Sequence, residues 1–338
     1  MLAERGITVK KLILLLVFPL TFLLFSCGSR DTEINFYGMG TLCSAKVYED
    51  SGDISEKIKR SVLDSENLLS CRIEASDISK LNRDRKIKAD KDMFDVLKMC
   101  QLVSDETENR YSVLIGNLTS LWDFDSDSPK VPSDESIKKA LSDIENSVMT
   151  FSDGKNISVS GNADTDMGSV GKGFACDRAV GILNENSKKG IVSVGGSLGM
   201  TKSPDGKSGF SIAVRDPFGT KNDVIGVLEI ENCFVSTSGS YEKCFEYDSK
   251  KYHHILDKKT GFPYDGEFVS VTVVSDSGAV SDALSTACFL EPLDKCLEIL
   301  KNHKSEAVFV RNDGSIIVTK GLENRFSASD GRQVSFVE

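Results

Sequence analysis

Two oxygen-bearing side chains near the C-terminal end of the sequence, Asp282 and Thr286, are spaced for joint binding of a hard cation. Residues four positions apart lie on the same face of an α-helix. A carboxylate and a hydroxyl in that arrangement suit Mg²⁺, which takes one or two carboxylates and completes its shell with water and phosphate oxygens. On spacing alone, the polar surface of an ordinary amphipathic helix is the commoner source of such a pair. The chemical interpretation therefore depends on motifs upstream.

A glycine-rich segment at residues 166–173, Asp-Met-Gly-Ser-Val-Gly-Lys-Gly, is suited to holding phosphate. We expect a strand to end here, small residues to turn the chain, and a helix to begin. Backbone N–H groups at a helix start bind phosphate, glycines permit close approach, and Lys172 adds a positive charge. The spacing of Gly and Lys differs from that of a P-loop, and a plain tight turn explains the segment equally well.

Histidine is rare in this chain, and two of its three histidines, His253 and His254, are adjacent on an expected strand edge. Side chains alternate along a strand, so the two imidazoles should point to opposite faces. An imidazole titrates near neutral pH and can act as a base, although a single histidine is more often structural than catalytic. We expect the third, His303, to be solvated after a helix.

The composition limits the possible functions. The chain has 338 residues, of which 40% are hydrophobic, enough for a large core in one or two domains. Its formal net charge of −10 argues against a nucleic-acid-binding surface. A phosphate-rich ligand is still compatible with this charge, because a bound metal ion can supply the local positive charge.

The N-terminus has the organisation of a bacterial lipoprotein signal. A basic segment precedes an apolar run over residues 12–25, which is short for a membrane span, and Cys27 follows closely. We expect residues 1–26 to be a signal peptide, Cys27 to be lipidated, and residues 27–34 to be a tether. The alternative is an uncleaved anchor helix. Either arrangement places the folded part outside the cytoplasm, and we expect it in the periplasm, anchored to the inner membrane.

Eight cysteines lie beyond Cys27, from a total of nine. None forms a Cys-x-x-Cys pair, which argues against a zinc site. Their even number in an exported protein permits disulfides, whose pairing the sequence does not give. We expect most of them, including Cys288 and Cys296 in helical patterns, to be small buried apolar residues.

The hydrophobic patterns predict an α+β fold in which helices and strands are clustered rather than strictly alternating. Helices are expected over residues 54–69, 92–107, 133–145, 171–184, 279–290 and 292–302. Strands are expected over residues 36–48, 157–160, 165–167, 191–194, 210–214, 224–230, 234–237, 254–256 and 269–274, with a further hairpin over residues 307–319.

A series of short motifs, taken in order, resembles the FAD:protein FMN transferase family, also called ApbE. The motifs are Met39-Gly40-Thr41, Leu121-Trp122, residues 166–173, residues 193–196, residues 236–241, residues 254–257 with Thr260-Gly261, and residues 282–286. No single motif is decisive, but the ordered set is specific. The resemblance extends from about residue 36 to the C-terminus.

The resemblance implies one domain over residues 35–338 with a T-fold-like α+β architecture: mixed and antiparallel sheets, flanking helices, and a cleft for FAD between sub-domains. It implies Mg²⁺-dependent transfer of the FMN half of FAD to a threonine hydroxyl of a target flavoprotein, with release of AMP. Typical targets are subunits of the Rnf complex and of the Na⁺-translocating NADH:quinone reductase. Two alternatives remain open, an FAD pyrophosphatase that yields FMN and AMP, and a non-catalytic FAD-binding lipoprotein.

The resemblance also implies roles for individual residues. Asp282 and Thr286 match the family's metal ligands, carbonyl groups near Ser169 and Ala279 match supporting metal contacts, and His254 matches the proposed base. The positions of the flavin contacts hold Met39, Arg72, Arg110, Tyr111, Ser112, Asp166, Lys172 and Ile255. Attack on a diphosphate needs a metal to neutralise phosphate oxygens and a base to take the hydroxyl proton, so the set agrees with the chemistry.

Two positions on the flavin side depart from the residues that the family often has. Arg72 stands where the family often has Tyr. Residues 109–112 stand where it often has Gly-Ala-Phe-Asp, so that Ser112 replaces an acidic side chain. Both departures bear on the strength and pose of FAD binding, and they leave the metal and histidine chemistry untouched.

Overall fold

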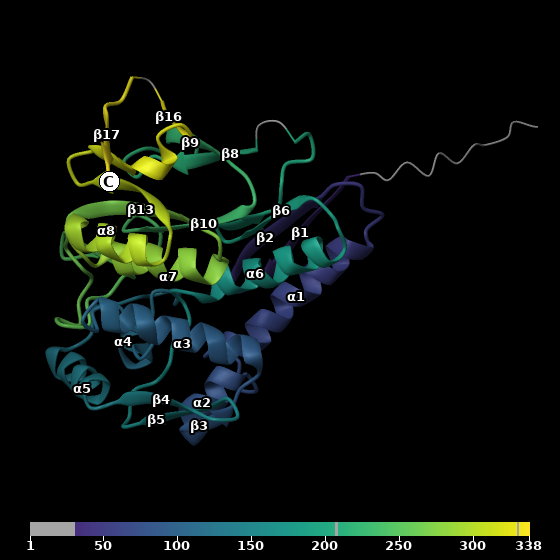
Figure 1. Cartoon of the computed structure of the whole chain (residues 1–338). Helices are drawn as coiled ribbons and strands as arrows, with labels where there is room; N and C mark the ends of the chain where they lie inside the picture. Colours follow the sequence, from purple (N-terminus) through teal and green to yellow (C-terminus); the bar gives the residue numbers. More distant parts are fainter. Residues whose placement is uncertain (1–30, 207–208, 330) are drawn as a thin grey trace, which may run out of the picture.

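The computed structural model of the chain describes residues 31–206, 209–329 and 331–338 (Figure 1). The predicted signal peptide and the predicted lipidation site, Cys27, lie outside these residues. Among the described helices, none combines the length and the apolar character that crossing a membrane requires. The described chain is layered, with a large sheet in the middle and helices below it (Figure 1).

A nine-stranded sheet forms the centre of the molecule, in the order β1-β2-β6-β7-β10-β13-β14-β15-β17. All neighbouring pairs are antiparallel except β15 and β17, which are parallel. Its strands are β1 (Thr32–Gly38), β2 (Thr41–Val47), β6 (Gly190–Val194), β7 (Ser197–Met200), β10 (Cys233–Gly239), β13 (Phe268–Ser275), β14 (Glu306–Arg311), β15 (Ile316–Thr319) and β17 (Val334–Val337). Because β2 pairs with β6, the sheet joins segments that are far apart in sequence.

Helices α1 (Asp53–Leu69), α6 (Gly171–Glu185), α7 (Gly278–Phe289) and α8 (Leu293–Asn302) lie along one face of this sheet (Figure 1). Helices α6 and α7 meet at two glycines. A Cβ atom on Gly173 would lie only 1.9 Å from the carbonyl oxygen of Gly278, so neither helix could carry a side chain at this point. The close approach brings the first turns of α6 and α7 together.

A further layer packs below these helices (Figure 1). It contains α2 (Asp77–Asp84), α3 (Lys91–Glu106), α4 (Gly116–Trp122), α5 (Asp134–Glu145) and a sheet in the order β3-β5-β4, formed by β3 (Lys86–Lys88), β4 (Val148–Ser152) and β5 (Asn156–Ser160). Its buried side chains, such as Leu97 and Trp122, belong to the same apolar cluster as Val271 of β13 and Leu284 of α7. The lower layer is therefore packed directly against the helices that carry the candidate site.

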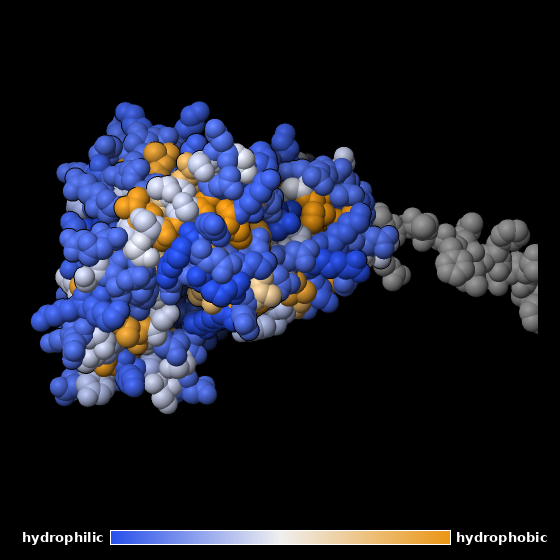
Figure 2. Space-filling model, turned by 90° about the horizontal axis from the view of Figure 1, so that it is seen from below, coloured by the Kyte–Doolittle hydropathy of each residue, from blue (hydrophilic) through white to orange (hydrophobic). Residues whose placement is uncertain are grey.

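The opposite face of the large sheet is covered by a smaller sheet, in the order β16-β9-β8. Leu228 of the smaller sheet is buried in one cluster with Val235 and Val308 of the large sheet. The remaining elements are β8 (Phe210–Arg215), β9 (Val224–Ile230), β16 (Phe326–Ala328), the β11 (Cys244–Tyr247) and β12 (Lys250–His253) hairpin, and a 3₁₀ helix (Lys320–Leu322). The face drawn in Figure 2 is mostly hydrophilic, and its apolar side chains form separate groups.

The structure confirms the predicted α+β class, with mixed and antiparallel sheets and flanking helices. The helices predicted from periodicity are present to within one residue at each end. Three strand predictions were wrong. Residues 36–48 form a hairpin that turns at Met39 and Gly40, both of which have positive φ. Residues 165–167 form no strand. Residues 254–256 form no strand either, because β12 ends at His253.

Candidate active site

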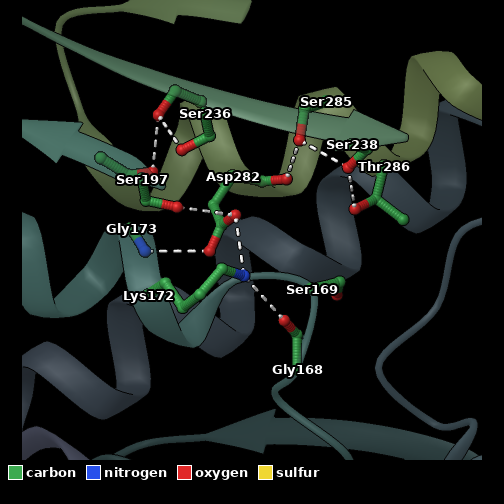
Figure 3. Close-up of polar contacts among 12 residues, drawn as sticks. Gly168, Ser169, Lys172, Gly173, Ser197, Ser236, Ser238, Asp282, Ser285 and Thr286 are labelled. Carbon is green, nitrogen blue, oxygen red and sulfur yellow. Dashed lines mark hydrogen bonds and ion pairs between the residues drawn. The ribbon is translucent and has the colours of Figure 1, made fainter. Parts of the chain in front are cut away.

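The predicted metal-binding carboxylate lies where α6 and α7 meet. Asp282 of α7 is buried, with 3% of its surface exposed. Its Oδ2 accepts a hydrogen bond from the Gly173 N–H at 2.9 Å, and its Oδ1 accepts one from the Ser197 hydroxyl at 3.3 Å. The Lys172 ammonium lies 3.4 Å from the same Oδ1 (Figure 3). The glycine-rich segment at residues 166–173 is therefore brought to this carboxylate.

A chain of hydroxyl groups connects Asp282 to Thr286. Thr286 Oγ1 lies 3.0 Å from Ser238 Oγ, which lies 2.8 Å from Ser285 Oγ. The Ser285 hydroxyl donates to the backbone carbonyl of Asp282 at 2.9 Å (Figure 3). Ser236, two positions before Ser238 on the same face of β10, makes a similar bond to α7. Strand β10 therefore presents a row of hydroxyls to the helix face that carries the predicted metal ligands.

Hydrogen bonds made by the side chains of Asp166 and Ser169 hold the turn before α6 in place. Asp166 accepts hydrogen bonds from the Thr119 hydroxyl at 2.6 Å and from the Gly168 N–H at 2.8 Å. The Ser169 hydroxyl donates to the Tyr111 oxygen, 3.2 Å away. In Figure 3, Ser169 lies on the segment that faces α7. This turn therefore has a defined shape in front of the Asp282 carboxylate.

A second carboxylate, on Asp177 of α6, orients the start of α7. It accepts hydrogen bonds from the Gly278 N–H at 2.6 Å, the Ala279 N–H at 2.8 Å and the Ser277 hydroxyl at 3.0 Å. A carboxylate in this position satisfies unpaired N–H groups and is favoured by the helix dipole. Burial raises the pKa of Asp177, and these hydrogen bonds oppose the rise. Asp177 thus holds the first turn of α7 in place. This turn carries Ala279, a predicted metal contact, and leads to Asp282.

The two adjacent histidines have different surroundings. His253 is buried and uses both ring nitrogens: Nε2 lies 3.0 Å from the Tyr264 carbonyl oxygen, and Nδ1 accepts the Ile255 N–H at 3.3 Å. His254 is partly buried, and its Nδ1 has no hydrogen-bond partner among the residues that the structure describes. His253 therefore has a structural role, whereas the buried Nδ1 of His254 is left without a hydrogen-bond partner in the described part of the chain.

The surroundings of His254 keep its imidazole neutral. Burial is the largest cause, followed by the positive charges of Lys243 and Lys172, and together they lower the pKa of His254 from 6.5 to about 4. A neutral imidazole can accept a proton at pH 7. Lys172, whose charge acts on His254, is paired with Asp282 at 3.4 Å, so this lysine links the histidine and the carboxylate electrostatically.

Three other predicted flavin contacts, Met39, Ile255 and Ser112, have the following surroundings. Met39, in the β1–β2 turn, has its Cε only 3.1 Å from where a Cβ on Gly171 would lie, so it covers the start of α6. Ile255 is buried directly after His254 in the chain. Ser112 makes a local turn, in which its hydroxyl accepts the Leu114 N–H at 3.1 Å.

The remaining three predicted flavin contacts are engaged with other parts of the protein. Arg72 forms an ion pair with Asp125 at 2.6 Å. Arg110 donates to the Leu290 carbonyl at 3.0 Å, at the end of α7 away from the start of α6. Tyr111 is 1% exposed and reaches the site only through its contact with Ser169, described above. The structure does not bring Arg72 and Arg110 to the Asp282 carboxylate.

Two further sequence predictions can be compared with the structure. His303 is not solvated as predicted, because its Nε2 lies 2.7 Å from the Glu106 carboxylate and its side chain is 10% exposed. The contact ties the end of α8 to α3, away from the candidate site. The cysteines beyond Cys27 are free thiols, and all but Cys71 and Cys244 are buried, which confirms that most of them pack as apolar residues.

The oxygen donors around Asp282 fit a magnesium ion. Within residues 31–206, 209–329 and 331–338, no group of three or more His, Cys, Asp or Glu side chains is placed to hold a metal. The candidate set has one carboxylate, on Asp282, and its other donors are the Thr286 hydroxyl and backbone carbonyls. Mg²⁺ suits such a set because it prefers oxygen, needs only one or two carboxylates and keeps several waters. Metals that prefer sulfur or imidazole would not be held here.

The structure adds residues that sequence reasoning did not assign to the site. Ser197, Ser238 and Ser285 all bond within the Asp282-to-Thr286 segment. Ser238 falls in the motif at residues 236–241, and Ser197 directly follows the motif at residues 193–196, so a signal was present. Their contacts with α7 depend on the strand order β7-β10-β13, which local patterns do not encode.

Comparison with known proteins gives matches over most of the chain. The family model described as the ApbE family matches residues 39–309. The chain is 26% identical to the FAD:protein FMN transferase of Treponema pallidum, covering 91% of this chain and 93% of that protein. It is 27% identical to the FAD:protein FMN transferase of Klebsiella pneumoniae, covering 88% and 94%.

Solved structures match the fold as well. The ApbE protein of Thermotoga maritima superposes with a TM-score of 0.79 at 28% identity, covering 87% of this chain and 99% of that one. The flavin transferase ApbE from Vibrio cholerae superposes with a TM-score of 0.75 at 22% identity, covering 87% and 99%. The arrangement of sheet and helices described above is therefore shared with these proteins.

Proposed function

The chain belongs to the ApbE family, and on that premise we propose that it transfers FMN from FAD to a hydroxyl group of a target protein and releases AMP. This is the activity for which its relatives are named. The observation that carries the proposal is the buried carboxylate of Asp282, held beside Lys172 and the glycine-rich start of α6. A cation-binding carboxylate next to a phosphate-binding helix start is what cleavage of a diphosphate requires.

In this proposal, His254 takes the proton of the attacking hydroxyl. The hydroxyl oxygen bonds to the phosphorus of the FMN half, and the bond from that phosphorus to the bridging oxygen breaks. AMP leaves with the bridging oxygen, and the hydroxyl proton moves to a ring nitrogen of His254. A pKa of about 4 keeps the imidazole in the neutral form that can accept a proton, and it also makes this imidazole a weaker base than an ordinary histidine. A positioned base of this kind contributes roughly 10²–10⁴-fold to the rate.

We further propose that Mg²⁺ is held by Asp282 and Thr286, with backbone carbonyls near Ser169 and Ala279. When bound, the ion neutralises charge on the phosphate oxygens. Lys172 adds a second positive charge from α6. Met39, which covers the start of α6, would contact the nucleotide from the β1–β2 turn.

The acceptor in this proposal is a threonine hydroxyl of a flavoprotein subunit of the Rnf or Na⁺-translocating NADH:quinone reductase type. The proposed place of action is the periplasm, with the protein anchored to the inner membrane through lipid on Cys27. The support is the sequence pattern of residues 1–27, which predicts a lipoprotein signal that would export the chain to the side on which such an anchor lies.

Incubation of the purified protein with FAD, Mg²⁺ and a threonine-containing target domain tests the proposal. Covalent flavin fluorescence on the target in a denaturing gel, with an equal amount of AMP in solution, would support transfer. Free FMN and AMP with an unlabelled target would indicate a pyrophosphatase instead. Bound FAD that stays intact would indicate the non-catalytic alternative.

A further inference from the structure

Lys243, in the connection between β10 and β11, is fixed beside the proposed base. The backbone carbonyl of Lys243 accepts a hydrogen bond from the backbone N–H of His254 at 3.0 Å. The next residue, Cys244, pairs with His253 across the β11–β12 hairpin. The main chain of Lys243 is therefore held next to His254 by the hairpin. Its side chain is 54% exposed, so its ammonium remains accessible to a ligand.

The positive charges of two lysines from different elements act on the imidazole of His254. Lys172 comes from the start of α6 and Lys243 from the β10–β11 connection, and the charges of both act on the ring. The imidazole is neutral, and its buried Nδ1 has no partner in the described part of the chain. Two positive charges that act on a neutral, partly buried group attract an anion and repel a cation.

The ammonium of Lys243 is paired with Asp125. Its Nζ lies 2.6 Å from Oδ1 of Asp125, and Oδ2 of the same carboxylate lies 2.6 Å from the Arg72 guanidinium. The Asp125 carboxylate thus serves two cations. Asp123 lies 4.0 Å from the same guanidinium, so the cluster of two cations and two carboxylates has no net charge. All four side chains are at least one-third exposed, and ion pairs at this exposure contribute little to stability. Lys243 can therefore exchange Asp125 for another anion at low cost.

We propose that Lys243, together with Lys172, binds the diphosphate of the dinucleotide substrate, and that Asp125 is the counter-ion that positions Lys243. The inference rests on the proposed function, which supplies a ligand with two negatively charged phosphates. When the bond between the phosphates breaks, negative charge grows on the departing phosphate, and an ammonium placed there stabilises it. Asp125 competes with the diphosphate for Lys243, so its charge limits the affinity.

Titration of flavin fluorescence with the full-length protein measures FAD affinity independently of transfer. Lys243→Gln is expected to weaken FAD binding roughly ten-fold, as loss of a hydrogen bond to a charged group does. The matched control, Lys251→Gln, removes the same charge from an exposed position on β12 of the same hairpin and is expected to bind FAD like the wild type. Inorganic pyrophosphate, used as a competitor, should displace FAD from Lys243→Gln less effectively than from the wild type.

The role of the counter-ion is tested by Asp125→Asn. This variant is expected to bind FAD more tightly than the wild type, and the gain should disappear in Asp125→Asn/Lys243→Gln. If Asp125→Asn weakened FAD binding as much as Lys243→Gln does, Asp125, Lys243 and Arg72 would form a structural brace, and the inference would be overturned. Equal FAD affinity in Lys243→Gln and Lys251→Gln would also overturn it.

Lys243→Arg separates charge from packing, because it keeps the positive charge on a different side chain. It is expected to retain FAD affinity close to that of the wild type, and thermal unfolding of all variants shows whether the hairpin stays folded. A folded Lys243→Arg that lost as much affinity as Lys243→Gln would count against a role for the charge. If the wild type binds FAD but labels no target, the proposed function fails, while the affinity series still tests Lys243.

Discussion

Asp282 and His254 share one neighbour, Lys172, whose ammonium lies 3.4 Å from the carboxylate and whose charge contributes to the low pKa of the imidazole. This lysine connects the candidate cation site to the candidate base. The same three groups have the properties that diphosphate cleavage needs: a carboxylate for a metal, a positive charge for phosphate and a neutral base. Their roles can be separated by single substitutions.

Asp282→Asn is expected to lower turnover on the order of 10²-fold or more, because it removes the charge that holds a cation. Asn keeps an oxygen for the Gly173 N–H, whereas Asp282→Ala would leave that buried donor unpaired at a cost of about 1–3 kcal/mol. The measurement is AMP release across a Mg²⁺ titration, accompanied by thermal unfolding. Asp276→Asn, at an exposed position just before α7, is the control. Wild-type turnover of Asp282→Asn at saturating Mg²⁺ would contradict the assignment.

His254→Ala should lose FMN transfer by roughly 10²-fold or more while FAD still binds. His253→Ala should instead lower the free energy of unfolding, by about 1–3 kcal/mol, because His253 bonds to the backbone of Tyr264 and Ile255. AMP release, FAD fluorescence and thermal unfolding measured on both variants distinguish the two roles. A His253→Ala protein that is stable and inactive would show that the roles of the two histidines have been exchanged.

The dependence of activity on pH should reflect the unusual pKa of His254. Burial and the charges of Lys243 and Lys172 lower it to about 4, so the base form is already present above about pH 5. The part of kcat/KM that depends on His254 is therefore expected to rise around pH 4 and to be flat from about pH 6 upward. A pH profile of the wild type and of His254→Ala measures this part by difference. A rise centred near pH 6.5 that the variant lacks would contradict the burial of the imidazole.

Among the secondary-structure elements, the contact between α6 and α7 has the largest influence on the site. Gly173 and Gly278 allow the backbones to touch, Asp177 of α6 holds the first N–H groups of α7, and Asp282 of α7 accepts the N–H of Gly173. Each helix thus supplies a partner for the other. The two helices act as one unit that sets the distance between the glycine-rich turn before α6 and the Asp282 carboxylate.

Gly173→Ala is expected to destabilise the protein by about 1–3 kcal/mol and to reduce FMN transfer. Its Cβ would lie 1.9 Å from the Gly278 oxygen and 2.7 Å from the Asp282 Cβ, so the helices would have to move apart. Gly181→Ala, in the same helix with no atom within 4 Å of the new Cβ, is the control and should be neutral or slightly stabilising. Thermal unfolding and AMP release measure both effects. Equal stability of the two variants would argue against the close contact.

The sequence predicted those elements whose signals are local. Helices such as α1 and α8 were predicted nearly to their ends, because apolar residues recur with the helical period. The β1–β2 hairpin was missed because its turn, at Met39 and Gly40, lies within a continuous strand-like run. Asp282, Thr286 and His254 were assigned to the site from residue type, spacing and motif order, and their roles stay predictions. Ser197 and Ser238 could not be assigned, because their contacts arise from pairing between strands distant in sequence.

In the molecule as a whole, the strand order gathers distant segments around one point. α6 precedes β6, α7 follows β13, and β10 lies between β7 and β13 in the sheet. The chain has a net charge of −10, yet the groups next to His254 that lower its pKa include two lysines, Lys172 and Lys243. Each of these lysines is paired with a carboxylate, Asp282 or Asp125, so an anionic nucleotide would compete with that carboxylate for the ammonium. The global arrangement thus agrees with the chemistry proposed for the single residues.

The most direct test of this account is intact-mass spectrometry of a threonine-containing target domain after incubation with the protein, FAD and Mg²⁺. The account predicts that each modified domain gains the mass of one FMN moiety, that AMP appears in equal amount, and that a target with its threonine replaced by valine stays unmodified. Release of AMP and free FMN with no change in the mass of the target would contradict transfer, and absence of AMP would contradict diphosphate cleavage itself.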